Sequence, residues 1–137
     1  MLLGRIVLCI ATVTGAASAL AQSDKGDAKS AAAAIVDACP IVVVDIIEEK
    51  LEFARRFGAT HTVNARNIDA VQAIRDLTGG GVDYAIDAIG LPQTQDQILR
   101  AVKPGYAGLN RGGTALLIGI TPPDAKATLD TSLFVGN

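Results

Sequence analysis

The stretch PIVVVDIIEEK, residues Pro40 to Lys50, decides how this chain folds. Its aliphatic run, Ile41 to Val44, is too short for a helix and is typical of a strand that is covered on both faces. Asp45 ends the run, and helical spacing begins close after it. Strands of this kind belong to parallel sheets packed between helices, so the carboxylate at the strand end is the first candidate for a ligand-binding side chain.

Alternating strand and helix patterns continue outward from this stretch. Further strands are expected over residues 61–63, 82–89 and 114–120, and helices over residues 27–38, 48–57, 68–77 and from Pro92 to the Pro104-Gly105 pair. Asn67 is the expected N-cap of the helix at 68–77. Such alternation implies right-handed crossovers, and it predicts an α/β fold with one doubly wound parallel sheet, in a single domain that is complete or cut short.

The composition excludes several kinds of partner and site. The formal charge of −2 gives no basic field, so no nucleic-acid partner is expected. Cys9 and Cys39 are the only thiols, and His61 is the only imidazole. Zinc sites need three or four protein ligands, commonly at short spacing, and these three residues are scattered. The sequence therefore predicts no metal site and two ordinary buried thiols.

The first 25 residues support three interpretations. Arg5, an apolar run over 6–20 and the small residues of Ala19-Leu20-Ala21 resemble a secretory leader. The run is short and carries several polar residues, so no stable membrane span is expected. In a second interpretation, residues 6–10 form the first strand of the sheet. An unrelated or fused leader is a third alternative, and the sequence leaves the choice open.

Asp45 has a specific chemical use at a strand end. A carboxylate there accepts hydrogen bonds from both hydroxyls of an adenosine ribose and repels a 2′-phosphate, so NAD is predicted over NADP. Ile46 would then face the adenine, and Lys50 lies within reach of a ribose oxygen. The alternative is that Asp45 only caps the helix that starts near Ile47, as many acids do at such junctions.

The phosphate-binding loop that should precede Asp45 is poorly preserved. A dinucleotide fingerprint has three glycines, and the acid follows about 20 residues after them. Gly26 lies 19 positions before Asp45 and suits the third glycine, but Ala21 and Ser23 occupy the other two glycine positions. Their Cβ atoms, and the charge of Asp24, oppose a bound pyrophosphate. NAD binding by this chain is therefore expected to be weak or lost.

Three segments carry a resemblance to a known family: VVVDIIEEKLEFARRFGATHTVNA, LTGGGVDYAIDAIG and GGTALLIGITPP. From about residue 28 onward the chain resembles the coenzyme domain of the zinc-type, medium-chain alcohol dehydrogenases. The resemblance implies a Rossmann-like NAD-binding domain over residues 26–137. Residues 1–25 then form either a signal-like leader or a degenerate first strand and loop.

The resemblance also implies a set of cofactor-binding residues. Asp45 corresponds to the ribose acid, with Ile46 and Lys50 beside the adenosine. Ala88, Ile89 and Gly90 correspond to the lining of the adenine-ribose side. The strand end at Ile118, Gly119 and Ile120 corresponds to the backbone that meets the nicotinamide carboxamide, and spacing adds Gly26 to this set.

The function that the resemblance implies is that of an NAD-dependent alcohol dehydrogenase, of which this stretch carries the cofactor half. In the family, zinc ligands, proton relay and most of the substrate pocket belong to a separate catalytic domain, so no catalytic residue and no bound zinc are assigned here. Whether the chain is itself an enzyme stays open. No alcohol oxidation is expected from this polypeptide alone.

Two other functions remain open at this stage. One is a non-enzymatic nucleotide-binding or interaction module, and the other is an exported α/β domain without nucleotide function. The family implies a cytoplasmic protein, whereas cleavage of the first 21 residues would make it an exported one. Sheet-edge pairing into a homo-oligomer, through residues 116–120 or the tail, is a further expectation.

Overall fold

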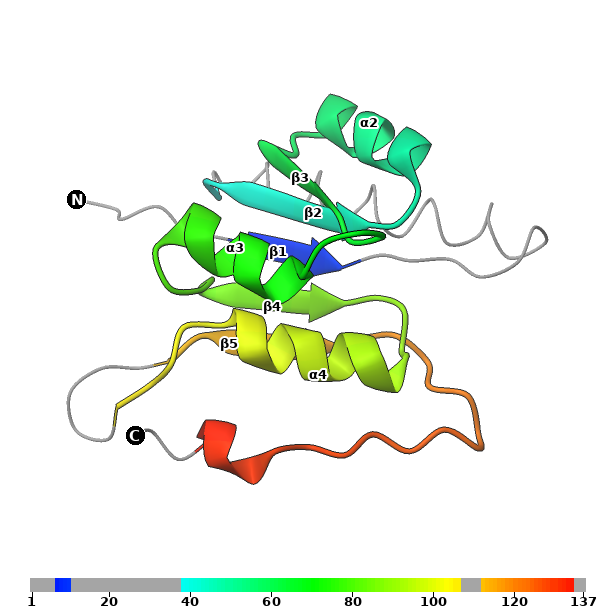
Figure 1. Cartoon of the computed structure of the whole chain (residues 1–137), viewed down its shortest axis with the longest axis vertical. Coiled ribbons are helices and arrows are strands. Elements are labelled where there is room, and N and C mark those ends of the chain that lie inside the picture. The colour runs from blue at the N-terminus through cyan, green and yellow to red at the C-terminus, as the bar shows by residue number, and fades with distance from the viewer. Residues whose placement is uncertain (1–6, 11–37, 107–111, 135–137) are drawn as a thin grey trace.

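A computed structural model gives the architecture (Figure 1), and it describes residues 7–10, 38–106 and 112–134. The strands are β1 (Val7–Ile10), β2 (Ile41–Asp45), β3 (His61–Asn64), β4 (Tyr84–Asp87) and β5 (Thr114–Leu117). The helices are α2 (Glu48–Arg56), α3 (Ala70–Thr78), α4 (Pro92–Ala101) and the 3-10 turn η1 (Thr131–Phe134). The five strands lie in the order β3-β2-β1-β4-β5, and all their pairings are parallel. The predicted doubly wound α/β sheet is confirmed.

The strand β1 lies in the centre of the sheet. Val7 is in register with Ile41 of β2 on one side and with Tyr84 of β4 on the other. Of the interpretations of the N-terminal segment, the strand is therefore the one that this structure contains. The expected helix at 27–38, the predicted cleavage point after Ala21 and the glycine position Gly26 lie outside the described residues.

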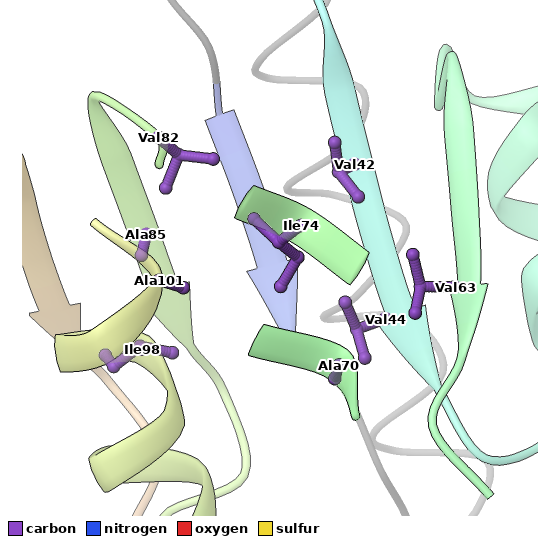
Figure 2. Packing of buried hydrophobic residues seen from close by; sticks show 9 residues of the cluster. All are labelled: Val42, Val44, Val63, Ala70, Ile74, Val82, Ala85, Ile98 and Ala101. Carbon is purple, nitrogen blue, oxygen red and sulfur yellow. The ribbon is translucent and has the colours of Figure 1, made fainter. Parts of the chain in front are cut away.

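The unbroken aliphatic run of β2 follows from its position between two layers. Val42 and Val44 pack toward α3 and α4, whereas Ile41 and Val43 pack toward α2. Figure 2 shows the first of these clusters, whose members are Val42, Val44, Val63, Ala70, Ile74, Val82, Ala85, Ile98 and Ala101. Alternate side chains of a strand point to opposite faces, so a strand covered on both sides must be apolar throughout.

The helix α3 begins later than its sequence pattern predicts. Its N-cap is Asp69, whose carboxylate accepts a hydrogen bond from the Gln72 amide at 3.1 Å. The prediction of Asn67 as the cap is therefore wrong, and Ile68 lies outside the helix with 54% of its surface exposed. Periodicity placed Ile68 in the helix because it continues the apolar spacing, but the capping carboxylate fixes the start two residues further on.

The strands β4 and β5 are shorter than expected, because the chain turns at their ends. β4 ends at Asp87, and the main-chain oxygen of Asp87 accepts hydrogen bonds from the amides of Ile118 (2.8 Å) and Gly119 (3.1 Å). β5 therefore stops at Leu117. At the end of α2, Gly58 has φ 99°, the left-handed conformation in which glycine commonly ends a helix. Within α2, Glu52 forms an ion pair with Arg55.

Candidate functional site

The carboxyl ends of β2 and β4 flank the central strand. Ile10, the last residue of β1, is in register with Val44 of β2 and with Asp87 of β4. Asp45 lies one residue beyond Val44, so the two strand-end carboxylates stand on either side of β1. The chain winds outward to β3 on one side and to β5 on the other. This is the topological switch point, where sheets of this kind bind their ligands.

The side chain of Asp45 organises the turn between β2 and α2. Only 1% of Asp45 is exposed, and its Oδ1 accepts a hydrogen bond from the Ile47 amide at 2.9 Å. Burial raises the pKa of the carboxyl above its usual range, and the hydrogen bond from Ile47 and the charge of Lys50 act in the opposite direction. Ile47 is the N-cap of α2, and no side chain caps this helix. The hydrogen bond to Asp45 therefore comes from the N-cap amide itself and not from an amide in the first turn of α2. A carboxylate has about four lone-pair sites, and acceptor capacity therefore remains for a ligand.

The loop after β3 is hydrogen-bonded to the loop after β2. The Ala65 amide donates to the main-chain oxygen of Asp45 at 3.0 Å, and Arg66 Nε donates to the main-chain oxygen of Ile46 at 3.2 Å. Asn64 Nδ2 donates to Glu48 Oε2 at 2.7 Å. These bonds bring Arg66 to the turn that carries Asp45. Arg66 is not among the residues predicted from the sequence. It could have been found, because it follows β3 closely and so lies near the carboxyl ends of the parallel strands, as Asp45 does.

Asp87 holds the loop after β4 in the way that Asp45 holds the turn after β2. It is fully buried, and its Oδ1 accepts hydrogen bonds from the Ile89 amide (2.9 Å) and Thr94 Oγ1 (3.1 Å). Its Oδ2 accepts from the Gly90 amide at 3.1 Å. Three donors satisfy this buried carboxylate, which would otherwise be costly to bury. Asp87 is not among the site residues that the sequence pattern predicts.

The loops after β4 and β5 are in backbone contact. A Cβ on Gly119 would lie 2.0 Å from the Gly90 nitrogen, and a Cβ on Gly90 would lie 2.5 Å from the Ile120 carbonyl carbon. A further hydrogen bond, from Gln95 Nε2 to Thr121 Oγ1 at 2.8 Å, fastens α4 to the chain that follows β5. The two loops therefore form one continuous surface beside the switch point.

The sequence matches the profile of the family described as zinc-binding dehydrogenase over residues 26–136. The chain belongs to this family. It is 37% identical to an alcohol dehydrogenase of Cupriavidus necator over 110 residues, which are 80% of this chain and 28% of that protein. Among solved structures, an alcohol dehydrogenase zinc-binding domain protein from Burkholderia ambifaria is 34% identical with a TM-score of 0.71, covering 95% of this chain and 31% of the other.

Benzyl alcohol dehydrogenase from Acinetobacter calcoaceticus superposes with a TM-score of 0.77 at 27% identity, covering 96% of this chain and 31% of that one. The chain thus spans less than a third of the length of these zinc-type dehydrogenases. Together with the parallel sheet, this overlap confirms the resemblance found from the sequence: the chain corresponds to the coenzyme-binding domain of the family.

The predicted cofactor residues of this domain fall into two groups on either side of β1. Asp45, Ile46 and Lys50 lie at the β2 end, and the second group lies at the ends of β4 and β5. The members of that second group are Ala88, Ile89, Gly90, Ile118, Gly119 and Ile120. Its two loops meet directly at the paired glycines, and 87% of Ile120 is exposed. Gly26 lies outside the described residues.

The described part of the chain does not fit a zinc ion. Within residues 38–106 and 112–134, no three His, Cys, Asp or Glu side chains are grouped to hold a metal. Cys39 is an exposed free thiol, so the prediction that it is buried is wrong. The Nδ1 atom of His61 lies 3.0 Å from Thr60 Oγ1. Within the same residues, no helix is both long enough and apolar enough to cross a membrane.

A surface groove between α3, α4 and η1 lies apart from the two strand-end groups. Its polar side chains are largely bonded within the protein. Arg75 Nη1 donates to the Arg100 main-chain oxygen at 3.0 Å, and Lys103 pairs with Asp83. The strand ends, rather than this groove, carry the chemistry expected of a dinucleotide site.

Proposed function

We propose that this chain is the coenzyme domain of a zinc-type alcohol dehydrogenase and that it binds NAD weakly, with Asp45 holding the adenosine ribose. The observation that supports this most is the position of Asp45, one residue beyond the register partner of Ile10, at the switch point of the sheet. A carboxylate there accepts hydrogen bonds from both ribose hydroxyls. Lys50, whose charge already acts on Asp45, lies beside the same position.

The remaining contacts with NAD are assigned to the loops after β4 and β5. Backbone groups of Ile118, Gly119 and Ile120 would meet the nicotinamide carboxamide, and Ala88, Ile89 and Gly90 would line the adenosine side. The close glycine contact supports this assignment, because it holds the two loops at a fixed spacing. A bound nicotinamide ring would supply hydride transfer, and the contribution of this chain is to bind and orient it.

Binding of NAD should depend on Asp45, and titration calorimetry on the full chain tests this. Asp45→Ala should weaken NAD and AMP binding by at least about tenfold, since a hydrogen-bonded charged group is lost. Asp45→Asn keeps the shape of the side chain and an oxygen for the Ile47 amide, so it guards against simple misfolding. Asp76→Ala, on the exposed face of α3, is the matched control. Unchanged titrations in both Asp45 variants would refute the ribose role.

A non-enzymatic nucleotide-binding module is the second candidate function. Such a module would keep the strand-end site at the switch point without a catalytic role. An assay of alcohol oxidation with added zinc and NAD separates the two functions. NAD binding without turnover supports the module, and robust turnover by a pure preparation excludes it.

We further propose that residues 1–21 are retained in the mature protein and that the protein is cytoplasmic. β1 pairs with both β2 and β4, so cleavage after Ala21 would remove the central strand of the sheet. NAD is chiefly an intracellular cofactor, and retention of this strand is consistent with its use. The mass of the purified chain decides the point, because a loss of 21 residues would leave the exported alternative.

We also propose a homodimer formed through β5. This strand pairs with β4 on one edge, and within the described residues no strand lies on the other edge. Leu117 is 50% exposed there, and an open apolar edge is prone to pair with a second copy. Size-exclusion chromatography with light scattering should show a dimer for the native chain and a monomer for Leu117→Lys. Equal masses would refute the interface.

A further inference from the structure

Arg66 lies beside the turn between β2 and α2, which carries Asp45. Two hydrogen bonds fix this residue: Arg66 Nε donates to the Ile46 main-chain oxygen at 3.2 Å, and the Arg66 amide donates to Asn64 Oδ1 at 3.1 Å. The Ala65 amide, one residue earlier, donates to the Asp45 main-chain oxygen. The guanidinium group therefore lies against the turn that presents Asp45.

The charge of Arg66 is available to a ligand. The residue is exposed, and among the described residues it makes no ion pair. Glu48, the acid on the adjoining turn, is bonded instead by Asn64 Nδ2. A guanidinium has five N–H donors, and among the described residues only Nε of Arg66 is used. The remaining donors form the planar fork that binds phosphate oxygens in pairs.

No such arginine is present where the sequence alone would place it. Ile46 and Ile47 follow the ribose acid directly, and neither is basic. The structure supplies the cation from the next strand, 20 residues after Ile46. Two opposite influences therefore meet at one ribose edge: Asp45 repels a phosphate there, and Arg66 attracts one.

We propose that Arg66 is a specificity-determining residue that lets this site accept an adenosine carrying a phosphate on its ribose, in addition to the unphosphorylated form. The inference rests on the proposed function, because it takes the ribose position from Asp45. The ligand class is a ribose-phosphorylated adenine nucleotide, with the phosphate bound by the guanidinium of Arg66. Asp45 then weakens this second ligand without excluding it.

Two ligands that differ by one phosphate test the proposal. AMP and adenosine 2′,5′-bisphosphate are titrated separately against the full native chain, Arg66→Ala and Arg66→Lys. Arg66→Ala should weaken bisphosphate binding by about tenfold, the effect of losing a charge-assisted hydrogen bond, and should change AMP binding by less than about twofold. Arg66→Lys should recover part of the loss. Arg56→Ala, which removes an exposed arginine from the last turn of α2, should change neither titration.

The outcomes separate this inference from the proposed function. If AMP binds and depends on Asp45, but the bisphosphate titration is unchanged in Arg66→Ala, the role of Arg66 is refuted and the ribose site stands. If the bisphosphate depends on Arg66 while AMP does not bind, the phosphate contact stands and the ribose site is refuted. Equal losses for both ligands, or no bisphosphate binding by the native chain, refute the role of Arg66. Displacement of the bisphosphate by the same concentration of inorganic phosphate would also refute it, because the site would then bind a free anion.

Discussion

Gly90 and Gly119 are in backbone contact at the carboxyl ends of β4 and β5, so close that a Cβ on Gly119 would lie 2.0 Å from the Gly90 nitrogen. Gly90 also has φ 82°, a conformation that other residues adopt at a cost. The contact joins loops whose glycines are 29 positions apart in the chain. It explains why two glycines are needed where the loops after β4 and β5 meet.

Substitution of Gly119 by alanine should open this contact. The added Cβ meets backbone atoms that cannot rotate away, so the free energy of unfolding should fall by about 1–3 kcal/mol or more. Amide hydrogen exchange should show lost protection at Gly90 and Ile118. Gly79→Ala is the control: Gly79 is also a glycine with positive φ, but a Cβ there meets nothing within 4 Å. Its cost should be about 1 kcal/mol, with exchange at Gly90 unchanged. Equal exchange patterns in the two variants would contradict the predicted contact.

Removal of the Asp87 carboxylate should be more costly than removal of the nearby Asp83 carboxylate. Asp87→Ala would leave the buried amides of Ile89 and Gly90 without their acceptor, with an expected loss of about 3 kcal/mol or more in urea unfolding. Asp83, just ahead of the same strand, pairs with Lys103 at a partly exposed position. Asp83→Ala should therefore cost about 1 kcal/mol or less. Similar losses in both variants would argue against Asp87 as the anchor of this loop.

Local patterns predicted the strands and helices well, because burial on two faces imposes a continuous aliphatic run on β2 and an apolar stripe on each helix. Asp45 was found for the same reason, since it ends such a run. The β1 segment was ambiguous because a short apolar run satisfies both a buried strand and a secretory leader. Only its pairing with β2 and β4, which are distant in sequence, distinguishes them.

The parts of the site that escaped prediction depend on contacts between distant segments. Arg66 follows a strand in a polar stretch, and nothing near it in sequence indicates that its side chain reaches Ile46. The role of Asp87 depends on Gly90, Thr94 and the chain after β5, which folding brings together. A sequence pattern can place a residue at a strand end, but it cannot name the partner that the residue will meet there.

The start of α3 gives a direct comparison between the sequence pattern and the structure. Asp69→Ala should lower the free energy of unfolding by about 1 kcal/mol, because the Gln72 amide loses its capping acceptor. Asn67→Ala, at the position that periodicity favoured, should change it by only a few tenths of a kcal/mol. Both values can be measured by urea unfolding followed by circular dichroism. A larger effect at Asn67 than at Asp69 would restore the earlier helix start.

The pH dependence of stability should reveal the burial of Asp45. Because burial raises the pKa of this carboxyl in the folded chain, the native state binds the proton more tightly than the unfolded state does. The contribution of Asp45 to stability is therefore fully present below its unfolded pKa of about 3.9 and is lost as pH rises through the native value. Asp45→Asn carries no charge to bury. Its stability relative to the native chain should rise as pH increases above the unfolded pKa, and should level off once pH exceeds the native pKa, in urea titrations.

A non-titrating change in the same turn provides the control for this experiment. Asn64→Ala removes the hydrogen bond to Glu48 but leaves the Asp45 carboxyl in place, so its difference from the native chain should be similar at each pH. If the stability difference between Asp45→Asn and the native chain stays constant or falls as pH rises, the contacts with Ile47 and Lys50 lower the pKa of Asp45 by more than burial raises it. A rising difference would show instead that the Asp45 carboxyl is kept at a cost to the stability of the unliganded fold, which is the pattern expected of a residue retained for binding.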